Sequence, residues 1–203
     1  MPNGLLDPNL GPEHHRVDNH HFYSVCETID DHADGSNSTN VALQWIGVDL
    51  ELETITFSQF KDQTNKFANV LRSLGIGKRD RIFSYMENLP EHYIATVGTL
   101  KSGAIAGPVP PSLAPDVVVS LLNNANVKVL VTVPELRENF TPMLPYLIEL
   151  QHIIVINKLG RDPDPLYMQD LSWEEEMDRA SIEFEVAKID RQDISTLHHD
   201  GGH

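Results

Sequence analysis

The stretch that decides the fold is residues 81–106, which read RIFSYMENLPEHYIATVGTLKSGAIA. It opens with a short run of branched and aromatic residues, Arg81–Tyr85, which is typical of a strand. Asn88–Ser102 is long enough for a helix, and the apolar residues Ala104–Ala106 begin a second strand. A strand, a helix and a strand in this order predict a βαβ unit with two parallel strands.

The alternation of helices and strands continues after this unit. We expect, in order, a helix, a strand, helical turns broken by prolines, and a further strand: Pro115–Ala125, Lys128–Val133, Pro134–Leu150 and His152–Ile156. The strands are rich in branched apolar residues, which is typical of strands buried on both faces. The sequence therefore predicts an α/β fold with a mostly parallel sheet and helices on both faces.

A β-hairpin is expected before this unit, because Val41–Ile46 and Glu53–Phe57 flank a turn around Gly47, Val48 and Asp49. A helix follows from Thr56. Its apolar face is formed by residues spaced three and four apart, namely Phe60, Thr64, Phe67, Leu71 and Leu74.

Residues that favour helix ends support these boundaries. Thr56 and Gln59 fit a capping box at the start of the first helix, and Gly75 fits its end. By the same reasoning Asn88, with Glu91, is expected to cap the second helix, with Gly103 beyond its end.

The chain divides into three parts. Residues 1–40 form a polar lead-in with a short helix that begins within His21–Cys26, and residues 41–157 form the α/β core. Residues 158–203 hold a loop, a short helix capped by Ser172, and a tail that we expect to be truncated.

Composition excludes several function classes. Thirty Asp and Glu residues against fifteen Lys and Arg give a formal charge of −15, which argues against nucleic acid and anionic membranes as partners. Cys26 is the single cysteine, so no internal disulfide is expected, and no apolar run is long enough for a membrane span. We expect a cytoplasmic protein.

Three segments, in this order, resemble a known family. They are Ile55–Phe60, Asn88–Glu91 and Leu100–Pro108, which read ITFSQF, NLPE and LKSGAIAGP. They are similar to the early signature segments of the adenylate-forming superfamily, the AMP-binding acyl-CoA synthetases. Phe67–Gly75 and Lys128–Thr132 are similar to the bacterial acetate–CoA ligases within it. The resemblance covers residues 42–199, although most of the matching residues are of the kind that build a scaffold.

The resemblance implies an activity for an intact parent. A carboxylate such as acetate attacks the α-phosphate of ATP, and the thiol of CoA then displaces AMP from the acyl-adenylate. ATP, Mg²⁺ and CoA are thus implied for the parent, together with a loop rich in Gly, Ser and Thr that holds phosphate. Only Gly202 matches that loop, and Asp200 stands where the family has Thr. An aspartate repels phosphate, so we expect no catalytic residue and no cofactor in this chain alone.

Gly107, Pro108 and Pro110 follow a predicted strand, where open α/β sheets place ligands, and are expected to border the active-site cleft of the parent. A rigid turn explains the prolines equally well. Two groups of histidines, in the lead-in and in the tail, lack the spacing of a metal site, and no metal is expected: His14, His15, His20, His21, and His198, His199, His203.

Two origins of the tail stay open. Truncation or frameshift of a ligase predicts an inactive piece that self-associates through exposed sheet surface. A degenerate paralogue predicts a non-catalytic binding or interaction module that folds alone. An unrelated nucleotide-binding α/β protein is a third alternative, which lacks support because no intact Gly-rich phosphate motif follows a strand.

Overall fold

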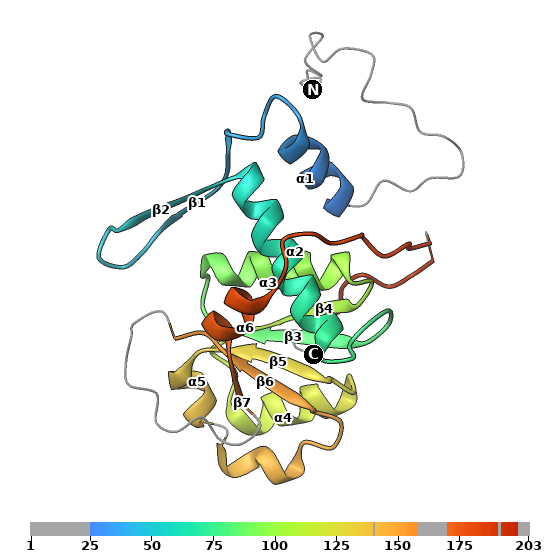
Figure 1. Cartoon of the computed structure of the whole chain (residues 1–203). Coiled ribbons are helices and arrows are strands. Elements are labelled where there is room, and N and C mark those ends of the chain that lie inside the picture. Colours follow the sequence, from blue (N-terminus) through green and yellow to red (C-terminus); the bar gives the residue numbers. More distant parts are fainter. Residues whose placement is uncertain (1–24, 140, 158–169, 191, 199–203) are drawn as a thin grey trace, which may run out of the picture.

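Five parallel strands form one sheet in the computed structural model, which describes residues 25–139, 141–157, 170–190 and 192–198 (Figure 1). Their order across the sheet is β4-β3-β5-β6-β7. The strands are β3 (Arg81–Tyr85), β4 (Ile105–Val109), β5 (Val129–Thr132), β6 (His152–Val155) and β7 (Asp170–Ser172). The predicted α/β fold with a parallel sheet is confirmed.

Helices cover both faces of this sheet (Figure 1). One face packs against α2 (Phe57–Ser73), α3 (Pro90–Lys101) and α6 (Trp173–Arg179). The opposite face packs against α4 (Pro115–Asn124), α5 (Pro134–Asn139) and the 3₁₀ helix η2 (Thr141–Tyr146). Successive strand residues point to opposite faces, so on β5 Val129 and Val131 belong to the first core and Leu130 to the second.

The hairpin of β1 (Val41–Ile46) and β2 (Leu52–Thr56) forms a separate antiparallel sheet that projects from the body (Figure 1). It was predicted with nearly these bounds. The indole Nε1 of Trp45 donates to the carbonyl oxygen of Asn88 at 2.7 Å, which ties the hairpin to the loop after β3.

The start of α2 confirms the predicted capping box. Thr56 Oγ1 accepts from the amide of Gln59, and the Gln59 side chain accepts from the amide of Thr56. Beyond the helix, Gly75 has a φ of 74°, a conformation that glycine adopts at little cost.

The predicted cap of α3 is wrong. The N-cap is Leu89, which makes no side-chain cap, and Pro90 occupies the first turn. Asn88 lies outside the helix, where its side-chain oxygen accepts from the hydroxyl of Tyr93 at 2.8 Å. Proline supplies the helical φ at the start of α3 and leaves one unpaired amide fewer there, and the helix begins without a cap from the Asn88 side chain.

Two strands differ from the prediction. β4 continues through Val109, so Gly107 and Pro108 lie inside the strand and not after it. Proline is tolerated there because β4 is the last of the five strands on its side of the sheet. The short strand β7 was not predicted. Its first residue, Asp170, accepts from the guanidinium of Arg137 at 3.0–3.1 Å, and both side chains are at most 4% exposed.

Candidate functional site at the carboxyl ends of β3 and β4

A pocket in the described part of the chain lies at the carboxyl ends of two neighbouring strands. Its volume is about 390 Å³, and it is lined by residues after β3, by one residue of α3, by the end of β4 and by His198: Met86, Glu87, Asn88, His92, Pro108, Val109, Pro110, Pro111 and His198. Helices α3 and α4, which follow β3 and β4, cover opposite faces of the sheet. This is the place where open α/β sheets bind ligands.

Two of the three residues expected to border the cleft line this pocket, namely Pro108 and Pro110. Gly107 is not among the lining residues. A β-carbon on Gly107 would overlap the ring of Phe83, which packs against it from β3. Gly107 thus lets the Phe83 ring lie flat on β4. The roles of all three in ligand binding stay a prediction, and Gly202 lies outside the described residues.

His92 is held in the pocket wall by a residue of β3. Its Nδ1 lies 3.1 Å from the hydroxyl oxygen of Ser84, and its ring meets that of Tyr93 edge to face. Burial lowers the pKa of His92, so the imidazole is neutral at neutral pH. A neutral ring with Nδ1 engaged by Ser84 leaves Nε2 as the one nitrogen for a ligand.

The end of the described chain reaches the same pocket. Thr196 forms a parallel bridge with Ala106, whose amide donates to the carbonyl of Ser195 and whose carbonyl accepts from the amide of Leu197, both at 2.9 Å. The segment Ser195–Leu197 therefore runs beside β4 in the same direction. His198 follows it and lines the pocket at the carboxyl end.

The lining residues lack cationic groups for phosphate. None of the described lining residues is Lys or Arg, and Glu87 adds a negative charge. Among the described residues, no group of three or more His, Cys, Asp or Glu side chains is placed to hold a metal ion. The histidines of residues 1–24, and His199 and His203, lie outside the described residues.

The family model for AMP-binding enzymes matches residues 30–199 of this chain. The chain belongs to the AMP-binding enzyme family. Members similar to it include the acetyl-coenzyme A synthetase of Bacillus subtilis (strain 168), which is 34% identical over 178 residues that cover 87% of this chain and 30% of the relative. The acetyl-coenzyme A synthetase of Streptomyces coelicolor is 27% identical over 173 residues, which cover 81% of this chain and 27% of the relative.

Solved structures agree on the fold of this AMP-binding family member. An acyl-CoA synthetase of Brucella canis superposes with a TM-score of 0.77 at 23% identity, over 88% of this chain and 31% of that one. An anthranilate CoA ligase in complex with anthranoyl-AMP gives a TM-score of 0.74 at 23% identity, over 86% and 32%. The chain spans about 30% of the length of the relatives and structures that it matches. None of the helices in the described residues is long and apolar enough to cross a membrane.

Sequence reasoning did not place the four polar or charged lining residues in the site. Glu87 and Asn88 directly follow β3, and the rule that singled out Gly107 after one strand would have found them after its neighbour. His92 lies in the first turn of the helix that follows, close to the end of β3, so the same rule indicates it as well. His198 was singled out from the sequence only as one of the tail histidines, because its place in the pocket depends on the pairing of Thr196 with Ala106, 90 residues away in the chain.

Proposed function

We propose that these residues are the amino-terminal part of an AMP-forming acid–thiol ligase. The intact enzyme converts acetate or another short carboxylate, ATP and CoA into acyl-CoA, AMP and pyrophosphate. Membership of the AMP-binding enzyme family supports the reaction class. The relatives named acetyl-coenzyme A synthetases support a short acid as substrate.

The observation that supports this proposal most is the place of Ser195–His198. This segment runs along β4 toward the pocket, and His198, the last residue that the structure describes, lines that pocket at the carboxyl end of the sheet. The family has its phosphate loop at this point of the sequence. In the proposal, the wall formed by Pro108, Pro110 and His92 is one side of a ligand cleft whose other side lies in the remaining two thirds of the enzyme.

The 203-residue chain alone is proposed to be inactive. Phosphoryl chemistry needs positive or hydrogen-bond-donating groups where charge develops. The described wall offers two imidazoles and one carboxylate, with no Lys or Arg, and the described residues lack a cluster for Mg²⁺. ATP, Mg²⁺ and CoA therefore belong to the intact ligase, and they do not fit the described residues alone.

We also propose the division of the chain, the partners and the location that the sequence led us to expect. Residues 1–40, 41–157 and 158–203 are proposed as lead-in, core and tail. The partners are the small-molecule substrates, with neither nucleic acid nor membrane, and the location is the cytoplasm.

A chimera tests the proposed function. The 178-residue segment of the Bacillus subtilis relative that matches this chain is replaced by the matching residues of this chain. The expected result is acetate-dependent exchange of labelled pyrophosphate into ATP. The same relative without any amino-terminal segment is the control, and it should show none. The proposal would be contradicted by a chimera that unfolds cooperatively like the relative but shows no pyrophosphate exchange with acetate or any other short carboxylate.

The alternative is a non-catalytic interaction module derived from this family. The tip of the hairpin favours it, because Val48 is 97% exposed and Leu50 is 82% exposed. Surface patches of this kind mark interaction sites. An interaction module would be monomeric and stable alone, and the chimera built from it would be inactive.

A further inference from the structure

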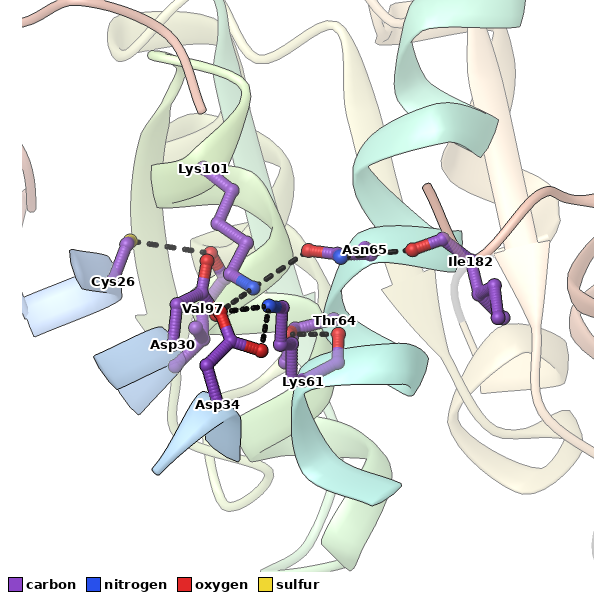
Figure 2. A network of polar contacts seen from close by, with 9 residues as sticks. All are labelled: Cys26, Asp30, Asp34, Lys61, Thr64, Asn65, Val97, Lys101 and Ile182. Atoms are coloured by element: carbon purple, nitrogen blue, oxygen red, sulfur yellow. Dashed lines mark hydrogen bonds and ion pairs between the residues drawn. The ribbon is translucent and has the colours of Figure 1, made fainter. Parts of the chain in front are cut away.

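One face of helix α1 (Val25–Asp34) contacts the groove between α2 and α3 through residues four positions apart. The thiol of Cys26 approaches the carbonyl oxygen of Val97 at 3.8 Å, Asp30 pairs with Lys101, and Asp34 pairs with Lys61 (Figure 2). Residues four apart share one face of a helix. The sequence predicted this helix but none of these contacts.

Lys101 is the unusual member of this network. Its side chain is 0% exposed, and its Nζ donates to Asp30 Oδ1 and to Asn65 Oδ1, both at 2.6 Å. Asn65 in turn donates to the carbonyl oxygen of Ile182, so the site joins α1, α2, α3 and the segment after α6 (Figure 2). A buried ammonium needs a partner of opposite charge. Among the carboxylates of the described residues, Asp30 is the one bonded to it.

The electrostatics of Lys101 depend on α1. Burial lowers the pKa of Lys101, while the hydrogen bond and charge of Asp30, and the nearby Cys26, oppose that change. Lys61 on α2 adds repulsion. If α1 leaves the groove, the burial from α2 and α3 remains in part and the compensating carboxylate is lost.

Apolar contacts hold α1 only weakly. Its buried apolar residues in the described chain are Cys26 and Ala33, both small; Ile29 is partly buried, and the His32 ring lies 4.9 Å from the ring of Phe57. Burial energy scales with apolar area, so these side chains contribute less than the large residues of α2 or α3. The charged contacts are therefore a large share of what holds α1.

We propose that α1 is a latch that can leave the groove between α2 and α3 while the sheet stays folded, and that the Asp30–Lys101 pair holds it closed. Two carboxylates of α1, four residues apart, face this groove, because Asp30 lies opposite Lys101 and Asp34 lies opposite Lys61. The two ion pairs differ in how strongly they hold α1. Lys101 is fully buried, whereas Lys61 is 24% and Asp34 70% exposed, so the outer pair is weakened by solvent. Loss of the inner pair opens the latch without unfolding the sheet. The proposed ligase reaction assigns no role to this site, and the inference does not depend on that reaction.

Hydrogen exchange of the whole 203-residue chain, resolved by residue, tests the latch. Asp30→Asn is expected to speed exchange of α1 amides by about tenfold or more, since hydrogen bonds to charged groups are among the strongest. Amides of α4, on the other face of the sheet, should keep their rates. The matched control Asp34→Asn removes the same charge four residues away and should change α1 exchange by less than about threefold.

A second variant separates the latch from a general loss of stability. In Asp30→Asn with Lys101→Met, the buried cation is gone and no carboxylate is needed, so α1 exchange should return most of the way to the parent rate. The proposal is overturned if Asp30→Asn and Asp34→Asn speed α1 exchange equally. It is also overturned if α1 and α4 open together, or if Lys101→Met fails to rescue Asp30→Asn. Failure of Asp30→Asn to fold would overturn the latch as well, because the sheet would then open together with α1.

Discussion

Gly98 of α3 lies directly against Phe67 of α2. A β-carbon on Gly98 would lie 2.9 Å from Cβ of Phe67 and 2.8 Å from the carbonyl oxygen of Thr64, closer than real β-carbons come. On its far side the Phe67 ring stacks on Trp173 of α6, with 5.0 Å between the ring centroids. A single buried ring, that of Phe67, thus links the three helices over one face of the sheet.

Gly98→Ala should therefore destabilise the domain. The new methyl meets backbone oxygen and a buried ring, so the helices must move apart, at a cost of about 1–3 kcal/mol in the free energy of unfolding. Urea unfolding followed by circular dichroism measures it. Gly77→Ala is the matched control, because nothing lies within 4 Å of its β-carbon, and its effect should be within about 0.5 kcal/mol. Equal effects of the two substitutions would show that the helices do not pack as described.

His92 should make stability depend on pH. Burial lowers the pKa of His92 in the folded state, so the unfolded chain binds the proton more readily. The contribution of His92 to the free energy of unfolding is therefore full above the ordinary pKa of about 6.5. It is lost as pH falls through the folded pKa. In His92→Asn the amide can still meet Ser84 and does not titrate here. The difference in unfolding free energy between the parent and His92→Asn should shrink from pH 7.5 to pH 5. A difference that is the same at both pH values would exclude a buried neutral imidazole.

The pairing of Ser195–Leu197 with β4 should depend on Asp193. Its carboxylate lies 2.6 Å from Nζ of Lys78 and accepts from the amide of Asp190 at 2.8 Å. The Asp190 amide first, and then Lys78, lower the pKa of Asp193, so this anchor is intact at neutral pH and is lost as acid protonates Asp193.

Asp193→Asn should speed exchange of the Ala106 amide several-fold at pH 7, because that amide donates to Ser195. It should also promote self-association through the uncovered edge of β4, measurable by sedimentation. Asp190→Asn removes the same charge and keeps the backbone donor, so it should leave both readings unchanged. Equal effects of the two variants would point to net charge as the cause.

The features that the sequence predicted well are local. Thr56 and Gln59 are three residues apart, and the buried face of α2 repeats with the period of one helix, so no distant contact was needed. The strands β3, β5 and β6 were found because both of their faces are buried and most of their residues are apolar or branched.

The features that the sequence could not predict depend on distant partners. β7 has three residues and takes its place by pairing with β6 and by the bond between Asp170 and Arg137, 33 residues apart. Asn88 is a residue type that favours helix N-caps. In the structure its side-chain oxygen accepts from the hydroxyl of Tyr93, and its carbonyl oxygen accepts from the indole of Trp45. The role of Lys101 was hidden for the same reason, because its partner Asp30 is 71 residues away.

Pyrophosphate exchange by the 203-residue chain tests the central claim most directly. The purified chain is incubated with acetate, ATP, Mg²⁺ and labelled pyrophosphate, and label in ATP is counted, with the Bacillus subtilis relative as positive control. We predict no acetate-dependent exchange above the level without protein. Acetate-dependent exchange that elutes with the folded chain in gel filtration would contradict the claim that this chain supplies only the amino-terminal wall of a ligase site.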